Sequence, residues 1–322
     1  MRTKLTQLLG VRYPVLNAPM TPQAGGALAC AVSDAGAFGM LGFDEDEAPE
    51  SLREQLRLLA AGPVARKFGI GLVRWVVDRR PELIELALKA RPKLVGLSFG
   101  DPAPYVARFH EAGILVAAQV QSRERAEIAL AAGVDIVVAQ GTEAGGHTGD
   151  VGTLPLLQIV LELANDVPVV AAGGIATGRG LAAVLAAGAA GAWIGTPFLA
   201  AREARTNAVA QSRLIATDET QTLLTSAFDR VQGKAWPAEF RGRALRNVFT
   251  DRWHEREDAI TAEAASSFRE ARKTQNYDVA HLYAGQTVAF IERVVPAADV
   301  VERIVADAEQ RLRDVASIVD AT

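Results

Sequence analysis

The sequence is poor in cysteine, in net charge and in clusters of basic residues, and each shortage excludes a class of protein. Its single cysteine among 322 residues, Cys30, excludes a disulfide framework and a Cys-based zinc site, and suits a reducing cytoplasm. A formal net charge of −4 without runs of lysine or arginine leaves no electrostatic footprint for nucleic acid. Disorder is excluded because 49% of the residues are hydrophobic. The partners we expect are small molecules, or further copies of the chain in a homo-oligomer.

Membrane and targeting segments are also missing. Residues 180–201 carry no charge and are long enough to be tested as a membrane span. The run consists mostly of Ala and Gly and is interrupted by Gly188, Gly191, Gly195 and Pro197, which is typical of a buried helix followed by a buried strand. The first residues contain no long apolar stretch and no small-residue cleavage site. We therefore expect a cytoplasmic protein that does not enter the membrane.

Short apolar runs alternate eight times with longer Ala/Leu-rich segments of helical period, which indicates a parallel sheet built from βα units. The predicted strands are Val15–Asn17, Phe38–Leu41, Lys67–Gly71, Leu94–Phe99, Leu115–Gln119, Ile136–Ala139, Val169–Ala172 and Ala192–Ile194. The predicted helices are Ala24–Ala35, Pro49–Ala61, Arg80–Ala90, Ala103–Ala112, Ser122–Ala132, Leu154–Ala164 and Arg179–Ala187. Because no strand alternates strictly, both faces are expected to be buried, and a closed (β/α)₈ TIM barrel is the economical fold. An open Rossmann sheet is the alternative, but Asn17-Ala18-Pro19-Met20 stands where G-x-G-x-x-G would follow the first strand.

After Ala200 the sequence becomes charged and poor in glycine, which predicts a helical insertion after the eighth strand. Such an insertion begins at the carboxyl-terminal face of a barrel, where active sites of this fold lie, so it is placed to act as a lid. We assign residues 1–200 and 287–322 to the barrel and residues 201–286 to the insertion, which is also the expected substrate domain. The segment Ala297–Ile318 is expected to form the last barrel helix.

Two glycine turns predict a phosphate site. Gly173-Gly174 follows the seventh strand and Gly195-Thr196 follows the eighth, where barrels commonly hold phosphate with backbone N–H groups. Neither turn contains Lys or Arg, which suits a single phosphomonoester better than a polyphosphate. The alternative is that these glycines only make tight βα turns.

A glycine-rich segment, Ala139–Gly149, follows the sixth strand and is expected to be a flexible loop that presents His147 to a ligand. Histidine titrates near neutrality, so it can act as an acid, a base or a donor to an anion. The alternative is an exposed loop histidine. His110 and His254 are expected on helix surfaces or in packing, and we expect no metal site. Serine hydrolase, HExxH zinc protease and Walker-loop motifs are absent from the sequence.

Together these residues resemble the nitronate monooxygenase family, formerly called 2-nitropropane dioxygenases, whose members are FMN-dependent (β/α)₈ barrels. The resemblance spans nearly the whole chain, and Ala139–Gly149 is its most specific part. The segments that carry it are Leu5–Val15 with Asn17-Ala18-Pro19-Met20, Gly36–Gly42, Ala139–Gly149, Ala171–Ile175, Gly195-Thr196-Pro197-Phe198 and Tyr283-Ala284-Gly285-Gln286.

The resemblance implies a role for individual residues. His147 would be the active-site histidine, Gln119 would contact the flavin after the fifth strand, and Gly141 would support it. The backbone of Ala18, Pro19 and Met20 would line the flavin ring. The FMN phosphate would be bound by Gly173, Gly174, Gly195 and Thr196, and the substrate by Tyr283 and Gln286. The chain departs from the family at Gly71-Leu72-Val73, where members often offer Asn-Leu-Thr to the flavin.

The implied reaction is oxidation of an alkyl nitronate, or of a nitroalkane, by FMN and O₂ to a carbonyl compound and nitrite. His147 would stabilise the anionic nitro oxygens or remove an α-proton. FMN-dependent enoyl-acyl-carrier-protein reductases, which use NAD(P)H, share the Glu-Ala-Gly-Gly-His element, but they tend to have Glu where this chain has Gln140. Two more functions stay open on this fold: a flavin-binding barrel without turnover, and a phosphate-sugar isomerase or lyase without flavin.

Overall fold

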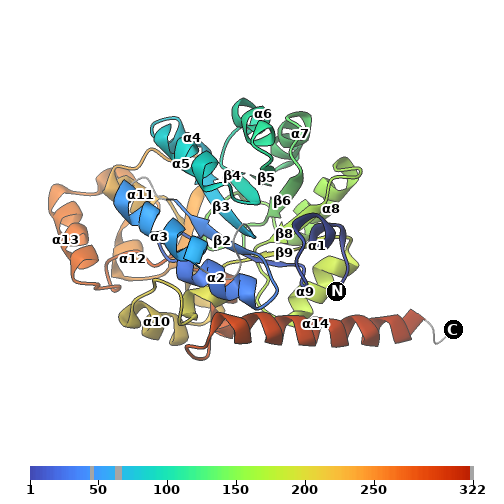
Figure 1. Ribbon diagram of the computed structural model, residues 1–322. Coiled ribbons are helices and arrows are strands. Elements are labelled where there is room, and N and C mark those ends of the chain that lie inside the picture. The colour runs from blue at the N-terminus through green and yellow to red at the C-terminus, as the bar shows by residue number, and fades with distance from the viewer. Residues whose placement is uncertain (44–46, 62–66, 320–322) are drawn as a thin grey trace.

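The eight predicted strands form a closed barrel of parallel strands in the computed structural model, which describes residues 1–43, 47–61 and 67–319 (Figure 1). The strand order around the barrel is β1-β9-β8-β6-β5-β4-β3-β2, and a bridge between Leu16 and Phe38 joins the two ends. The (β/α)₈ prediction is therefore confirmed. The strands are β1 (Val15–Asn17), β2 (Gly39–Gly42), β3 (Phe68–Val73), β4 (Leu94–Ser98), β5 (Leu115–Val120), β6 (Ile136–Gln140), β8 (Val169–Ala172) and β9 (Gly191–Ile194).

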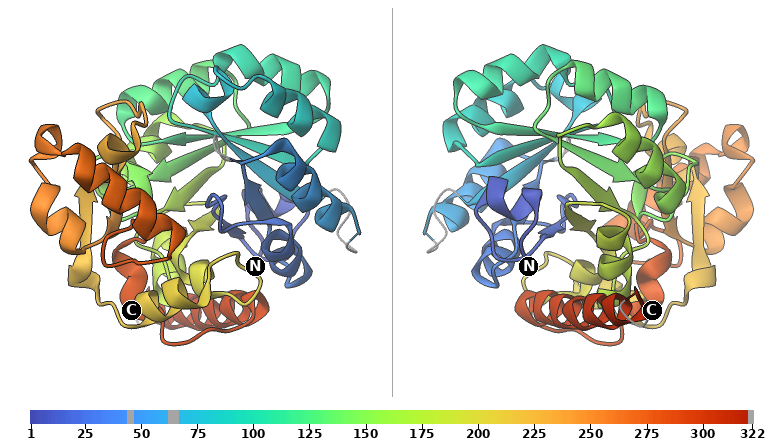
Figure 2. Two further views of the ribbon diagram at one scale, coloured as in Figure 1. Left: turned by 90° about the vertical axis from the view of Figure 1, so that its left-hand side faces the viewer. Right: turned by 90° about the vertical axis from the view of Figure 1, so that its right-hand side faces the viewer.

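Helices cover the outside of the barrel, as the amphipathic segments predict. They are α2 (Gly26–Asp34), α3 (Pro49–Ala61), α4 (Arg74–Val77), α5 (Glu82–Ala90), α6 (Ala103–Glu111), α7 (Arg123–Ala131), α8 (Thr153–Leu163), α9 (Gly178–Ala186) and α14 (Ala297–Val319). The long α14, red in Figure 2, packs against α9 and α2 and completes the outer layer. A short α1 (Lys4–Leu9) precedes β1, and neither this helix nor the single-turn α4 was predicted from the sequence. None of the helices in the described ranges combines the length and the apolar character that a membrane crossing requires.

The barrel interior is filled by side chains on the inner faces of the strands. Leu16, Phe38, Met40 and Trp193 belong to this inner cluster, and a separate cluster packs the outer strand faces against the helices. Both faces of the strands are thus buried, which explains their apolar sequences without strict alternation.

Asn17 joins β1 to β2 at the seam of the barrel, the place where these two strands are connected by a single bridge and not by a full ladder. Its side chain is fully buried; Nδ2 donates to the Met40 carbonyl at 2.7 Å, and Oδ1 accepts from the Met40 N–H at 2.8 Å. The amide therefore substitutes for backbone pairing at the point where the barrel closes.

The insertion lies at one end of the barrel, yellow to orange in Figure 1. Its helices are confirmed, but it also contains two strands that the sequence did not predict. These strands, β10 and β11, form an antiparallel sheet with β7 (Gly146–Thr148), which follows the carboxyl end of β6. The elements from the end of β9 onward are η1 (Thr196–Ala200), α10 (Ala208–Ile215), η2 (Glu219–Gln221), β10 (Thr222–Thr225), α11 (Ala227–Gln232), β11 (Arg241–Leu245), α12 (Val248–Trp253), η3 (Glu257–Ala259), α13 (Ala262–Lys273) and η4 (Gln286–Phe290).

Candidate active site

His147 lies in strand β7 and not in a flexible loop, so that part of the sequence interpretation was wrong. The strand pairs with β11, where His147 is opposite Gly242. On the barrel side, Gln140 Nε2 donates to the His147 carbonyl at 3.0 Å, and Gln121 Nε2 donates to Gln140 Oε1 at 2.8 Å. The two glycines before the histidine have different causes: a Cβ on Gly145 would come within 2.5 Å of the Gly285 nitrogen, whereas Gly146 has a φ of +73°, which favours glycine. The backbone of His147 is therefore held from both sides.

The His147 imidazole is paired with a carboxylate from the insertion. Nε2 lies 2.9 Å and 3.0 Å from the two carboxylate oxygens of Asp229, in the first turn of α11. Both residues are buried, with 9% and 5% of their surface exposed. When Nε2 carries the ring hydrogen and donates it to Asp229, Nδ1 is left as the acceptor. The carboxylate then stabilises the imidazolium that forms if Nδ1 takes up a proton.

Aromatic side chains enclose this pair. The Trp236 ring stacks on His147 with centroids 3.4 Å apart and planes inclined by 7°, and Tyr283 lies 5.6 Å away by centroids. Phe99 meets Trp236 edge-on at 5.0 Å and has a φ of +61°, which is uncommon for a bulky residue and typical of functional sites. Trp75 packs edge-on against Trp236 at 5.1 Å. These rings surround the imidazole with apolar surface that excludes water.

The Trp75 indole provides an unused donor in this apolar enclosure. Its Nε1 is buried and has no hydrogen-bond partner among the described residues. Because a buried donor without a partner costs roughly 1–3 kcal/mol, an ordered water or a ligand acceptor at this position would stabilise the protein.

The predicted phosphate turns meet beside this site. Gly173 and Gly174 have φ values of +92° and +70°, and a Cβ on Gly173 would lie 2.9 Å from the Gly141 carbonyl oxygen. A side chain at Gly173 would thus strain the backbone and collide with the Gly141 carbonyl, so this turn requires glycine. The neighbouring Glu143 carboxylate is already engaged, because it accepts from the Thr153 N–H at 3.0 Å and caps α8.

The second turn is joined to the late Ala-Gly-Gln element. Gly285 N–H donates to Thr196 Oγ1 at 2.9 Å, so the Thr196 hydroxyl hydrogen is left to donate to another group. Gln286 N–H donates to the Glu143 carbonyl at 3.0 Å, and the Gln286 side chain is exposed. The structure therefore brings Gly195-Thr196, Gly285-Gln286 and the start of the β6–β7 segment together.

The segment after β1 crosses the mouth of the barrel next to these turns. Ala18 N–H donates to the Ile194 carbonyl at 2.7 Å, and a Cβ on Gly195 would lie 3.3 Å from Met20 Sδ. Pro19 packs over Gly71, where any side chain would collide with its ring. All three residues of the predicted flavin-lining segment are half-buried.

Gln119 lies on β5 and uses its side-chain oxygen within the barrel. Oε1 accepts from Ser98 Oγ at 2.6 Å, which leaves the two amide hydrogens of Gln119 to donate elsewhere. A flavin contact by Gln119 stays a prediction, as do the assigned roles of the other site residues.

A profile of the nitronate monooxygenase family matches residues 62–307 of the chain. The chain belongs to this family. It is 30% identical to a nitronate monooxygenase of Pseudomonas aeruginosa, over 95% of this chain and 99% of that protein. It is also 32% identical to a Mycobacterium tuberculosis enzyme, (3aS,4S,5R,7aS)-5-hydroxy-7a-methyl-1-oxo-octahydro-1H-indene-4-carboxyl-CoA dehydrogenase, over 71% of this chain and 64% of the enzyme. Among solved structures, FabK of Thermotoga maritima has a TM-score of 0.86 at 27% identity and covers 99% of both chains.

The resemblance to this flavin oxidoreductase family is thereby confirmed, but sequence reasoning missed several site residues of this member. Asp229 and Trp236 lie in the charged insertion without a local motif, so no sequence signal identified them. Arg243 of β11 was also missed: it is buried, and its Nε donates to the Thr142 carbonyl at 2.8 Å. Burial lowers the pKa of the Arg243 guanidinium, while nearby Glu143 opposes that shift.

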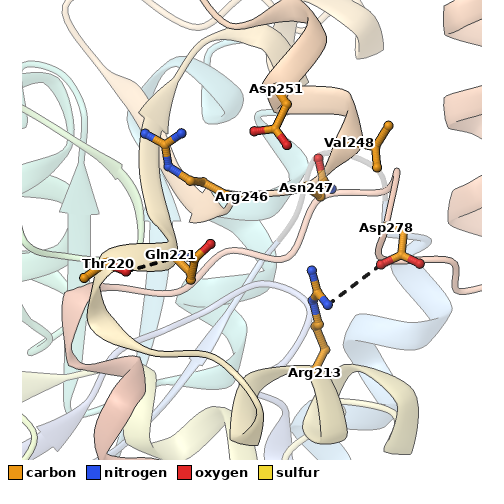
Figure 3. A pocket seen from close by; sticks show the side chains of 8 residues that line it. All are labelled: Arg213, Thr220, Gln221, Arg246, Asn247, Val248, Asp251 and Asp278. Carbon is orange, nitrogen blue, oxygen red and sulfur yellow. Dashed lines mark hydrogen bonds and ion pairs between the residues drawn. The ribbon is translucent and has the colours of Figure 1, made fainter.

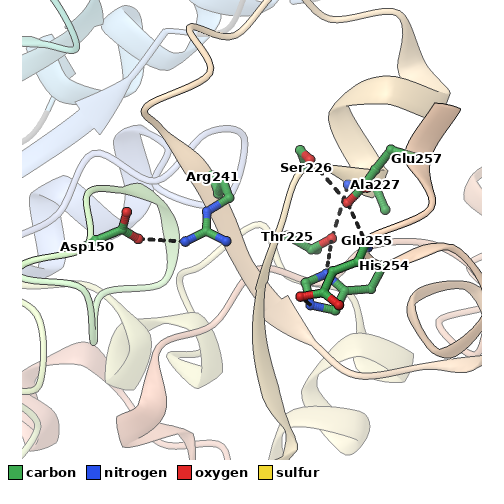
Figure 4. Close-up of polar contacts among 8 residues, drawn as sticks. All are labelled: Asp150, Thr225, Ser226, Ala227, Arg241, His254, Glu255 and Glu257. Atoms are coloured by element: carbon green, nitrogen blue, oxygen red, sulfur yellow. Dashed lines mark hydrogen bonds and ion pairs between the residues drawn. The ribbon is translucent and has the colours of Figure 1, made fainter.

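The other histidines lie outside the catalytic arrangement. His110 Nε2 is 2.8 Å from Asp135 on the surface, as its helix position predicts. His254 Nδ1 is 3.2 Å from Thr225 Oγ1, in the polar cluster that Figure 4 shows.

His281 is enclosed between Phe228, Phe268 and Tyr283, and its Nδ1 has no partner among the described residues. Burial lowers its pKa to about 3, helped by the nearby positive charges of Arg272 and Lys234. This imidazole is therefore neutral at pH 7.

Figure 4 also shows how the insertion is tied to the barrel. Arg241 of β11 pairs with Asp150, just beyond β7, at 2.7 Å between nitrogen and oxygen.

In the described part of the chain, no three His, Cys, Asp or Glu side chains are grouped so that they could hold a metal ion.

Proposed function

We propose that the protein uses FMN and O₂ to oxidise alkyl nitronates, or nitroalkanes, to a carbonyl compound and nitrite. The observation that carries the proposal is the buried His147–Asp229 pair under the Trp236 ring, next to the two glycine turns. Membership of the nitronate monooxygenase family supports the same reaction. FMN, when bound, supplies the redox chemistry, and the chain supplies orientation and electrostatics.

The residues present fit an FMN phosphate. The Gly173-Gly174 turn offers backbone N–H groups that no side chain covers, and the Thr196 hydroxyl has a hydrogen to donate, so the donors of this cradle are backbone amides and one hydroxyl. Such neutral donors suit one phosphomonoester. The half-buried segment Ala18-Pro19-Met20, adjacent to Gly195, supports a place for the flavin ring across the barrel mouth.

His147 would act on the nitro group of the substrate. With Nε2 held by Asp229, Nδ1 can accept the α-proton of a neutral nitroalkane, and the resulting imidazolium can hydrogen-bond to the anionic oxygens of a nitronate. Gln121 and Gln140 would keep the histidine backbone in register through their hydrogen bonds. The aromatic side chains would exclude water and strengthen these interactions.

The test is the variant His147→Ala, assayed for nitronate-dependent O₂ uptake. We expect it to keep bound FMN and to lose at least about tenfold in turnover, because general acid–base groups contribute ~10²–10⁴-fold. His110→Ala, on the surface of α6, is the matched control and should keep full activity. Unchanged turnover in His147→Ala would remove this residue from the mechanism.

A second candidate is an FMN- and NAD(P)H-dependent enoyl-thioester reductase. The likeness to the enoyl-acyl-carrier-protein reductase FabK, at 99% coverage of both chains, favours it. The dehydrogenase relative, which is named for a carboxyl-CoA compound, also points to thioesters. NAD(P)H oxidation with an enoyl thioester, measured beside O₂ uptake with a nitronate, separates the two reactions.

A further inference from the structure

A cavity of about 320 Å³ between the barrel and the insertion is lined by positive charges. Arg79 reaches it from the turn between α4 and α5, Lys234 from the end of α11, and Arg269 and Arg272 from one face of α13. Its remaining lining includes the buried side chains of Val231 and Phe268, and none of the described residues that line it is acidic. The cavity therefore combines an apolar floor with a cationic rim.

A second cavity of about 560 Å³, shown in Figure 3, differs from the first because its lining carries charges of both signs. It lies within the insertion, and its charged lining consists of two arginines and two aspartates. The closest oppositely charged atoms of Arg213 and Asp278 are 3.8 Å apart. Its charges balance within the protein. All the charged residues that line the smaller cavity are positive, so an anion that enters it is attracted from several sides.

The cationic cavity shares its walls with the active site. Gly233 and Lys234 directly follow α11, whose first turn carries Asp229, and Lys234 N–H donates to the Asp229 carbonyl at 3.0 Å. Trp236, only two residues further on, stacks on His147. A ligand held at Lys234 would thus contact the segment that positions both partners of the histidine.

A row of side chains leads from this cavity to His147. Arg79 Cζ lies 5.2 Å from the Trp75 ring centroid, and Trp75 and Trp236 are 5.1 Å apart by centroids. Trp236 then contacts His147 at 3.4 Å. This row of adjacent side chains between the cavity and His147 suits one extended ligand, with an anionic end in the cavity and a reactive end at the histidine.

We propose that this cavity binds the phosphate groups of a nucleotide-linked reactant. Arginine guanidinium groups match phosphate oxygens in bidentate geometry, and several cations around one cavity suit more than one phosphate. Two reactants carry such a group: a coenzyme A thioester and a reduced nicotinamide dinucleotide. The proposal rests on the second candidate function, because a coenzyme A thioester and a reduced nicotinamide are reactants of an enoyl-thioester reductase and not of nitronate oxidation by O₂. The reactive end of the ligand must then reach His147.

The experiment measures binding directly, by titration calorimetry of the flavin-loaded protein with coenzyme A, 3′,5′-ADP, NADPH, 2′,5′-ADP and inorganic phosphate. We expect at least one nucleotide to bind more tightly than inorganic phosphate, with an affinity that falls as salt is raised. Preference for coenzyme A and 3′,5′-ADP identifies a thioester, and preference for NADPH and 2′,5′-ADP identifies the reductant.

The variant is Arg269→Gln combined with Arg272→Gln, which should weaken nucleotide binding at least tenfold. Its matched control is Arg313→Gln, an exposed arginine of α14, which should change the affinity less than twofold. Thermal unfolding reports whether each variant folds, and Arg269→Gln alone replaces the double variant if that one does not. Absence of nucleotide binding, binding that ignores salt, or equal losses in variant and control would overturn the proposal.

The same preparation is assayed for nitronate-dependent O₂ uptake. Nucleotide binding without nitronate turnover contradicts the proposed reaction and keeps the cavity assignment. Nitronate turnover without nucleotide binding contradicts the cavity assignment and keeps the proposed reaction. The two failures are therefore distinguishable.

Discussion

The buried pair of His147 and Asp229 gives a quantitative prediction. Asp229→Asn keeps the size of the side chain and removes the charge that faces Nε2 at 2.9 Å and 3.0 Å. A hydrogen bond to a charged group contributes about 1.5–3 kcal/mol. Because 1.36 kcal/mol corresponds to a factor of ten in rate, kcat/KM for the nitronate should fall roughly 10- to 150-fold. The variant should still bind FMN, since Asp229 lies on α11 and outside the glycine turns.

A double-mutant cycle decides whether Asp229 acts through the histidine. The variants are Asp229→Asn, His147→Gln and their combination, assayed by steady-state O₂ uptake. If the carboxylate only positions and charges the imidazole, the combined variant should be no slower than His147→Gln alone, because residues in contact are not additive.

The control for the cycle is Asp258→Asn, which loses a surface pair with Arg230 in the same insertion and should stay within about twofold of the parent. Losses that simply add, or a twofold effect of Asp229→Asn, would refute the positioning role.

Three further expectations concern stability and cofactor binding. Since the pKa of His281 is lowered to about 3, the unfolded chain binds a proton that the folded one does not, and unfolding free energy should fall by roughly 2 kcal/mol from about pH 7 to about pH 5. His281→Phe should remove that part of the pH dependence in urea titrations, and an unchanged dependence would contradict the burial argument. Gly173→Ala should weaken FMN binding about tenfold in flavin-fluorescence titrations, whereas Gly113→Ala, also at positive φ but with open space around it, should not. Asn17→Leu should cost roughly 2–5 kcal/mol in urea unfolding, because the Met40 N–H and carbonyl lose their partners; a loss below about 1 kcal/mol would argue against the seam contact.

Much of the fold follows from local sequence. Short apolar strands without strict alternation predict burial on both faces, and the barrel meets that condition with inner and outer clusters. Every strand limit lies within two residues of the predicted one, which is the ordinary uncertainty of an element's ends. Gly36, Gly113, Gly133 and Gly188 each follow an alanine at the end of a helix and have positive φ, which is typical of a glycine at that position. Gly62 also follows an alanine, Ala61, but lies outside the described residues.

The insertion was harder to interpret from its sequence. Its helices were expected, but β10 and β11 lie in a charged region, and β11 pairs with β7 about ninety residues earlier in the chain. The pairing preference of such strands depends on their neighbours more than on their own residues. The same pairing changed His147 from a predicted loop residue into a buried strand residue.

The sequence by itself determined the barrel and the glycine turns at its carboxyl end, and it indicated His147 as the candidate histidine, because periodicity and turn chemistry act over a few residues. Only the tertiary structure decided which groups surround that histidine. Asp229 stands 82 residues from His147 in the chain, and their contact depends on where α11 packs over β7. The cationic cavity is likewise assembled from the α4–α5 turn, α11 and α13, which no local pattern connects. Long-range packing brings these charges together, and so it sets the chemistry at the mouth of the barrel.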